Sequence, residues 1–217
     1  MKVAIKIGGS VSIDEFGPKV KYFKKLIPVL DILKKKVDKL IVGIGGGKFV
    51  RNYYSAIGSL LCDYRKELLA IDLLKANVRF LSYLIGGKPV FSFDKIPRSK
   101  ILCIGGIKPG RSTDANTSYL AAKFGVDYLI FLTDVNGIYN RNPKKFRNAK
   151  LIKYLHFKDL DEIIQKKTSP GNYGVIDPVA IKIIKQNKIH TFVVNGNDPK
   201  SILRVLDGEK IGTEIYG

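Results

Sequence analysis

Three short apolar runs in this chain of 217 residues each end in paired or tripled glycines, which constrains its fold more than any other feature. The runs with their glycines are Val3–Ile7 with Gly8-Gly9, Leu40–Ile44 with Gly45-Gly46-Gly47, and Ile101–Ile104 with Gly105-Gly106. Glycine lets the backbone approach a phosphate closely and take positive φ. In open α/β sheets, ligands bind beyond the carboxyl ends of the strands, where the next helices offer free N–H groups. Three such turns on one sheet predict a polyphosphate or phosphoryl-transfer site.

Helix-length segments alternate with these runs along the whole chain. The helical candidates are 21–36, a stretch around Arg51, 66–84, 114–124, 178–185 and 200–206. Two further apolar runs, Asp127–Leu132 and His190–Val194, have the length of strands. This alternation is typical of an α/β layered fold with a mostly parallel sheet. The length predicts a single domain, 1–217.

The chain is strongly basic, with 38 Lys and Arg against 19 Asp and Glu and a net charge of +19. Such a charge is compatible with a nucleic-acid partner, but the basic residues are spread over the whole chain and do not form one tail or one helix. We therefore expect small anionic ligands and no nucleic acid as the main ligand.

Other sequence signals exclude several classes of protein. Cys62 and Cys103 are isolated thiols, which argues against a disulfide scaffold or a zinc module. No apolar run reaches the roughly 18 residues of a membrane span, so we expect no membrane partner and a cytoplasmic location. The Walker pattern fails because Lys48 is followed by Phe49, and the dinucleotide fingerprint fails at 43–48. The HRD and DFG motifs of eukaryotic-type kinases are also missing.

Five segments resemble those of the amino acid kinase superfamily. They are IKIGGSV (5–11), GIGGGKFVRNY (43–53), GGIKPGRSTDAN (105–116), LTDVNGIYNRNPKKF (132–146) and VIDPVAIKII (175–184). The order and the amino-acid sequences of these segments look like those of the archaeal branch of the UMP kinases, and the match runs over essentially the whole chain. The combination of GGxxPGxxTDA with TDVNGIY is specific, whereas the glycine turns alone are not.

The resemblance implies a three-layer αβα sandwich that transfers the γ-phosphoryl group of ATP, with Mg²⁺, to the phosphate of UMP, a step of pyrimidine nucleotide biosynthesis. It also implies a homo-oligomer, a hexamer or a dimer. About 1–125 would bind the acceptor, and about 126–217 would bind ATP. No side chain need attack in such a reaction, because the acceptor phosphate is itself the nucleophile. Positioning and neutralisation of charge then carry the catalysis.

The resemblance also assigns roles to individual residues. The catalytic set is Lys6 on the transferred phosphoryl group, Lys182 as a second lysine, and Asp114 holding the two lysines. The ATP-binding set is Gly8, Gly9, Ser10, Gly47, Arg51, Thr133, Asp134, Tyr139 and Asn142. The acceptor-binding set is Gly46, Glu67, Ile107, Lys108, Pro109, Gly110, Arg111, Ser112 and Thr113. No metal ligand is assigned, because Mg²⁺ would travel with ATP. Structural interpretations remain open for several of them: Asp114 complements a helix dipole in any case, and Lys6 and Lys182 could face solvent.

This chain departs from the family pattern mainly on the acceptor side. Glu67 stands where the family has a ribose-binding aspartate, and Ala70 and Leu74 replace a glycine and a threonine. Lys108 and Arg111 add positive charge next to Pro109-Gly110, which still suits a phosphorylated acceptor. Two alternatives therefore stay open. One is a kinase of the same fold for another phosphate monoester, such as isopentenyl phosphate or a furan phosphate; the other is a non-catalytic oligomer that binds or stores an anion.

Overall fold

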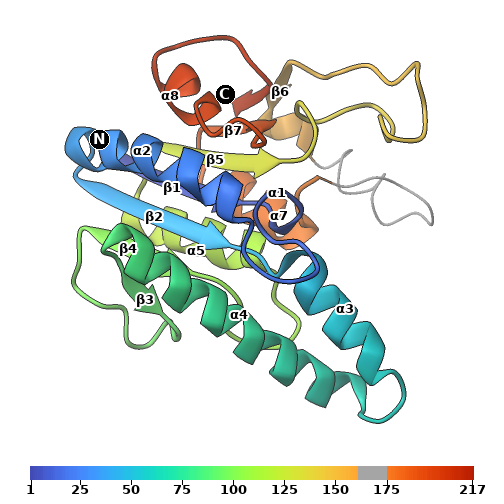
Figure 1. The fold of residues 1–217 in the computed structure, drawn as a ribbon. Coiled ribbons are helices and arrows are strands. Elements are labelled where there is room, and N and C mark those ends of the chain that lie inside the picture. The colour runs from blue at the N-terminus through green and yellow to red at the C-terminus, as the bar shows by residue number, and fades with distance from the viewer. Residues whose placement is uncertain (161–174) are drawn as a thin grey trace.

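The computed structural model describes residues 1–160 and 175–217, which form one eight-stranded sheet with helices on both faces (Figure 1). The spatial order of the strands is β3-β4-β2-β1-β5-β7-β8-β6. In chain order their bounds are β1 Lys2–Ile7, β2 Lys39–Ile44, β3 Lys88–Val90, β4 Ile101–Ile104, β5 Tyr128–Thr133, β6 Tyr154–His156, β7 Thr191–Asn195 and β8 Thr213–Tyr216. All neighbouring strands run parallel except β7 and β8, which pair antiparallel.

Helices connect several of the parallel strands, because parallel neighbours need a long crossover connection. The helices are α1 Gly9–Ser12, α2 Val20–Lys36, α3 Gly47–Ile57, α4 Asp63–Ile85, α5 Thr113–Phe124, the 3₁₀ turn η1 Phe157–Asp159, α7 Pro178–Gln186 and α8 Ser201–Leu206. In Figure 1, α3 and the beginning of α4 extend away from the sheet as an arm. Among the described residues, no helix combines the length and the apolar character needed to cross a membrane.

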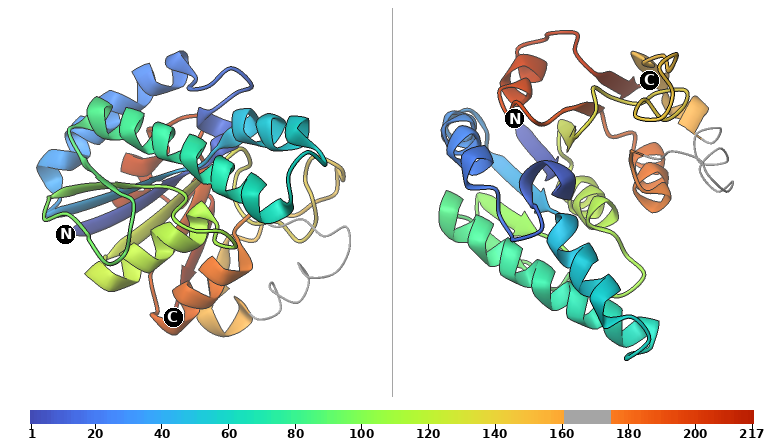
Figure 2. Two further views of the ribbon diagram at one scale, coloured as in Figure 1. Left: turned by 90° about the horizontal axis from the view of Figure 1, so that it is seen from below. Right: turned by 45° about the vertical axis from the view of Figure 1, so that its right-hand side comes forward.

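Two hydrophobic cores fill the spaces on the two faces of the sheet. Val3, Ile5 and Ile7 of β1 pack with α2, α4 and α8 on one face, whereas Ala4 packs with α5 and α7 on the other. Figure 2 shows these helices on opposite sides of the strands. Because both faces are covered, the central strands are almost continuously apolar, as parallel strands usually are. The predicted α/β fold with a mostly parallel sheet and helices on both faces is confirmed.

The predicted elements are found with small shifts of their ends, but three short strands were not predicted. β3 has the sequence KPV, and a proline at its centre argues against a strand unless it lies at an edge, where β3 does lie. β6 and β8 are three and four residues long; they pair with each other, and β8 also pairs with β7, so tertiary contacts define them and periodicity does not.

Candidate active site

The three glycine turns follow β1, β2 and β4, which are adjacent in the sheet. A Cβ atom on Gly9 would lie 2.3 Å from the Gly47 backbone nitrogen, so the first two turns touch each other. A Cβ atom on Gly105 would lie 3.3 Å from the carbonyl oxygen of Ile44, beside the second turn. Gly47 has φ +62°, a conformation that favours glycine. The three turns therefore meet at one edge of the sheet, and any side chain at Gly9 would separate them.

Free backbone N–H groups line the first turn, but fewer than the sequence suggested. The Gly8 N–H donates to the carbonyl oxygen of Leu132 at 2.8 Å, so it is not available to a phosphate. The described contacts give no acceptor for the N–H groups of Gly9 and Ser10, which begin α1. The N–H groups of Gly46 and Gly47, at the start of α3, likewise have no acceptor among the described contacts. The Gly8 N–H is therefore paired with β5, and the N–H groups of Gly9 and Ser10 remain as candidate donors of this turn.

A buried ion pair lies beside these turns. The Lys6 ammonium is 2.7 Å from Asp114 Oδ1, and the two side chains are only 14% and 12% exposed. Lys6 is the next-to-last residue of β1, and its side chain lies on the sheet face that α5 covers. Asp114 lies in the first turn of α5. The neighbouring Asn116 fastens the helix to the third glycine turn, because its Nδ2 donates to the Gly105 carbonyl at 2.9 Å.

The beginning of α7 reaches the same carboxylate. The Asp177 N–H donates to Asp114 Oδ2 at 3.2 Å, while the Asp177 side chain caps α7 by accepting from Val179 and Ala180. Lys182 follows on the exposed side of α7. The described contacts include no hydrogen bond or ion pair of Lys182 with Lys6 or Asp114. The structure thus joins Lys6 with Asp114, and Lys182 lies exposed in the middle of α7.

Apart from Gly46 in the second glycine turn, the predicted acceptor residues lie on one loop, 107–113, hereafter the acceptor loop, and on α4 beside it. Glu67 Oε2 accepts a hydrogen bond from the Gly110 N–H at 2.8 Å. Arg111 places its guanidinium over the rings of Phe93 and Tyr119. Ser112 caps α5 through the Ala115 N–H, and Thr113 begins the helix. Ile107 and Pro109 are half-buried, and Lys108 is exposed.

The predicted ATP residues after β5 share one long loop. The buried Thr133 hydroxyl donates to the Val135 carbonyl, so it holds the turn in shape. Asp134 forms an ion pair with Lys144, and Asn142 accepts from the Lys144 N–H. Tyr139 pairs its backbone with Leu151. Arg51 lies apart from this group, exposed on α3.

The chain is similar over its whole length to known uridylate kinases. The profile of the amino acid kinase family matches residues 96–195. The uridylate kinase of Methanobrevibacter smithii is 31% identical, over 99% of each chain. The crystal structure of uridylate kinase from Archaeoglobus fulgidus superimposes with a TM-score of 0.82 at 28% identity, covering 100% of each chain. The chain belongs to the amino acid kinase family.

A more distant member of this fold is a kinase with a different acceptor. The isopentenyl phosphate kinase of T. acidophilum, solved as a product complex, has a TM-score of 0.69 and 19% identity, covering 100% of each chain. At that identity the likeness establishes the amino acid kinase fold alone. The closer agreement with the uridylate kinases extends to both sequence and structure.

Several residues at the site were not predicted from the sequence. Phe93 and Tyr119 lie under Arg111, Lys144 pairs with Asp134, and Asp177 contacts Asp114 through its backbone. Asp177 is the only one of these with a local signal, because an Asp before Pro at a helix start indicates an N-cap. The others come from segments distant in the sequence, and no spacing rule connects them.

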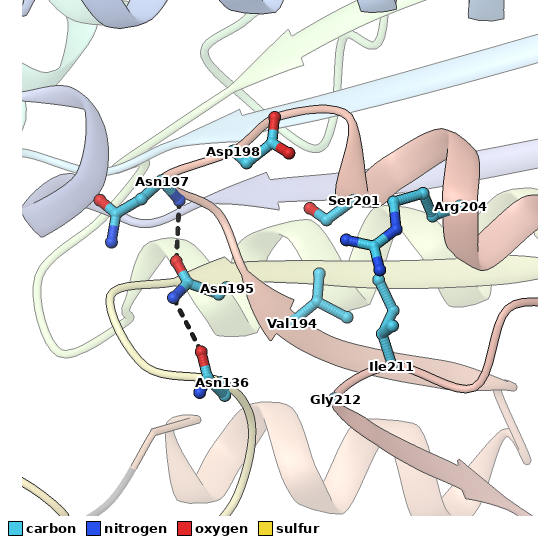
Figure 3. Close-up of a pocket in the computed structure, with 9 residues that line it drawn as sticks. All are labelled: Asn136, Val194, Asn195, Asn197, Asp198, Ser201, Arg204, Ile211 and Gly212. Atoms are coloured by element: carbon cyan, nitrogen blue, oxygen red, sulfur yellow. Dashed lines mark hydrogen bonds between the residues drawn. The ribbon is translucent and has the colours of Figure 1, made fainter.

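A cavity of about 550 Å³, which Asn136 of the 133–142 loop helps to line, opens beyond the end of β7, near the start of α8 (Figure 3). Asn195 Nδ2 donates to Asn136 Oδ1 at 2.9 Å on one side of it. Arg204 is the cationic side chain among its lining residues, and Glu209 neutralises it through two contacts. Asp198 adds a negative charge. This cavity is therefore unsuited to a phosphate group, whereas the glycine turns beside Lys6 are well suited to one.

No cluster of three or more His, Cys, Asp or Glu side chains that could hold a metal ion occurs within 1–160 and 175–217. Asp114, the acidic residue beside Lys6, is already engaged by Lys6 and by the Asp177 N–H. The donor groups at this site therefore match phosphate oxygens, which accept from ammonium and N–H groups.

Proposed function

We propose that this chain catalyses the transfer of the γ-phosphoryl group of ATP to the phosphate of UMP, giving UDP and ADP. The observation that carries the proposal is the buried Lys6–Asp114 pair beside three touching glycine turns. An ammonium group and free N–H groups together are the usual surroundings of a phosphoryl group in transfer. The similarity to uridylate kinases over 99% of the chain supports UMP as the acceptor.

The chemistry follows from the charges of the reactants. An oxygen of the acceptor phosphate attacks the γ-phosphorus of ATP, and the bond to the bridging oxygen of ADP breaks. Phosphate is already ionised, so no general base is needed. Negative charge spreads over the transferred group, and Lys6 stabilises it electrostatically. Mg²⁺ bound to the ATP phosphates would neutralise part of the remaining charge.

Asp114 acts on Lys6 and not on the substrate in this proposal. It holds the ammonium in one position, and the Asp177 N–H in turn holds the carboxylate. Gly9, Ser10, Gly46 and Gly47 present backbone donors to the ATP and acceptor phosphates. Lys182 would add a second positive charge from α7. We assign 1–125 to acceptor binding and 126–217 to ATP binding, with the 133–142 loop beside the nucleoside of ATP.

A panel of acceptors tests the proposal, with ATP as donor and ³¹P NMR to identify the products. The panel contains UMP, CMP, AMP, GMP, isopentenyl phosphate, a furan phosphate and a carboxylate substrate. We expect UMP to give the highest kcat/KM, with UDP as product. A higher value for isopentenyl phosphate or for the carboxylate would overturn the proposal. ATP binding without turnover of any acceptor would instead support the anion-storage alternative.

Nucleic-acid binding is the alternative from a different class, and the basic charge alone motivates it. It predicts affinity for DNA or RNA that falls steeply with salt and does not depend on ATP. In a titration from 50 to 200 mM salt, we expect only weak binding without a preferred sequence. Tight binding to a defined oligonucleotide would favour the alternative over the kinase.

We further propose that the chain is a cytoplasmic homo-oligomer, a hexamer or a dimer. Large apolar side chains remain exposed along the arm of α3 and α4, namely Tyr53, Leu60, Tyr64 and Leu68. Exposed apolar groups gathered on a projecting element are typical of subunit contacts. Light scattering coupled to gel filtration measures the mass directly, and a monomer at micromolar concentration would contradict this part of the proposal.

A further inference from the structure

Two side chains that are expected to contact the acceptor, Glu67 and Arg111, connect the acceptor loop to other parts of the fold. Glu67 reaches from α4 to the middle of the loop, where its Oε2 accepts from the Gly110 N–H at 2.8 Å. Gly110 has φ +72°, so this residue forms the bend of the loop. A hydrogen bond to an ionised carboxylate is about twice as strong as one between neutral groups. Glu67 therefore fixes the bend to α4.

Arg111 anchors the next residue of the loop on the other side. Its guanidinium carbon lies 5.2 Å from the centre of the Phe93 ring and 5.0 Å from that of Tyr119. The two rings are themselves in contact, with centroids 4.4 Å apart. Phe93 lies between β3 and β4, and Tyr119 lies on α5. A guanidinium over two aromatic faces is attracted to both, so Arg111 joins the loop to two further segments.

We propose that Glu67 and the Arg111–Phe93–Tyr119 cluster form a clamp that holds the acceptor loop in its binding conformation. They are positioning residues, because they act on the acceptor through the loop. Lys108 is the other cationic side chain of the loop. Unlike Arg111 it is exposed, and the described contacts give it no ion pair. Under the clamp, Lys108 and the loop N–H groups meet the acceptor phosphate. The identity of this ligand rests on the proposed function.

The clamp has a specific kinetic consequence. If the loop is ordered before binding, acceptor binding does not have to include the entropy cost of ordering it. A more mobile loop therefore weakens acceptor binding. Asp114 follows the loop directly, but α5 is separately attached through Asn116 and the Gly105 carbonyl. The Lys6–Asp114 pair therefore keeps its geometry when the loop loosens. Loss of the clamp raises KM for the acceptor and leaves kcat and KM for ATP nearly unchanged.

Two measurements on the full chain report on the loop without any substrate. Hydrogen exchange at the Gly110 amide tests the Glu67 contact, and trypsin cleavage after Arg111, followed by mass spectrometry, tests the mobility of the loop. The variants are Glu67→Ala, Glu67→Gln, Phe93→Leu and Tyr119→Leu, all of which keep the Arg111 cleavage site. Matched controls are Asp72→Ala, another carboxylate on α4 that pairs with Lys75, and the exposed Tyr83→Leu.

We expect Glu67→Ala to speed Gly110 exchange about tenfold, the ratio that corresponds to the loss of one charge-assisted hydrogen bond. Glu67→Gln keeps an acceptor oxygen and recovers most of the protection. Tyr119→Leu and Phe93→Leu speed cleavage after Arg111 about threefold, as the loss of one ring contact predicts. Both controls behave like the wild type. Equal exchange in the wild type and Glu67→Ala, or equal effects of the controls, would overturn the clamp.

Kinetics then connect the clamp to catalysis. With UMP as acceptor, Glu67→Ala should raise KM for UMP about tenfold, with KM for ATP and kcat changing less than about twofold. An equal fall of kcat with unchanged KM would contradict a positioning role. If the chain transfers no phosphoryl group to UMP at all, the proposed function fails, while the exchange and cleavage measurements still decide on the clamp.

Discussion

Two ion pairs lie at the carboxyl ends of the neighbouring strands β1 and β5, and they differ sharply in their surroundings. The Lys6–Asp114 pair is almost enclosed, with side chains 14% and 12% exposed, and a backbone N–H supports it. The Lys144–Asp134 pair is open to water, with side chains 55% and 32% exposed. Both carboxylates belong to motifs shared with kinases of this family. Only one of the pairs, however, is held in a fixed position.

This difference in burial indicates that the two ion pairs have different roles. Burying two charges costs more than their attraction returns in many proteins, so a buried pair is weak evidence for stability. An exposed pair contributes about 0–1 kcal/mol and is screened by salt. In the proposed reaction, a fixed ammonium in a site of low polarity acts more strongly on a phosphoryl group than an exposed one, which gives a functional reason to bury Lys6. The Lys144 pair has no comparable fixed charge to offer.

The largest effect is expected for Lys6→Ala, which removes the fixed charge. Turnover with ATP and UMP should fall by about 10²- to 10⁴-fold, as expected for loss of 3–5 kcal/mol of charge stabilisation. Steady-state rates of UDP formation measure it, with circular dichroism to verify folding. If the variant had the wild-type rate, Lys6 would have only a structural role, and the two ion pairs would not differ in function.

Asp114→Asn keeps the shape of the side chain and removes its charge. We expect kcat to fall by about 10- to 100-fold, because Lys6 loses its partner but stays at the site. The same change should lower the free energy of unfolding by about 2–3 kcal/mol, since a buried ammonium is left unpaired. Urea denaturation and initial rates measure the two effects. Lower stability with full activity would make the pair structural.

Lys182→Ala tests whether α7 contributes the second cation. Its ammonium is exposed, so water screens it more than Lys6, and we expect kcat to fall about tenfold with little change in stability. Lys123→Ala, an exposed lysine at the far end of α5, is the matched control. Equal rates for both variants would assign Lys182 to the solvated surface.

The smallest effect is expected for Lys144→Ala. The free energy of unfolding should change by less than about 1 kcal/mol, and KM for ATP should change by less than about threefold. Thermal denaturation and ATP titration at low and high salt measure both. A loss comparable to that of Lys6→Ala would contradict the contrast drawn between the two pairs.

The sequence predicted the central part of this fold and left its edge undetermined. Five strands are nearly continuous apolar runs because both faces of the sheet are covered, so β1, β2, β4, β5 and β7 could be located. β6 and β8 exist only because they pair with neighbouring strands, and such short segments carry no periodic signal. The local sequence pattern therefore predicts the central strands of the sheet but not its short edge strands.

At the candidate site, the glycine turns were predictable and the hydrogen bonds were not. Paired glycines after apolar runs indicate where the backbone must come close, which Gly9 and Gly47 bear out. Nothing in the sequence shows that Leu132 takes the Gly8 N–H, because that contact depends on the order of the strands. The sequence likewise does not show that Glu67, which is predicted to bind the acceptor, accepts a hydrogen bond from the Gly110 N–H.

A crystal structure with UMP and a non-hydrolysable ATP analogue tests the account most directly. It should place the γ-phosphate between the glycine turns after β1 and β2, within hydrogen-bond distance of the Lys6 ammonium, with the UMP phosphate at the acceptor loop. Phosphate groups bound away from these glycine turns, with Lys6 still engaged only by Asp114, would contradict it.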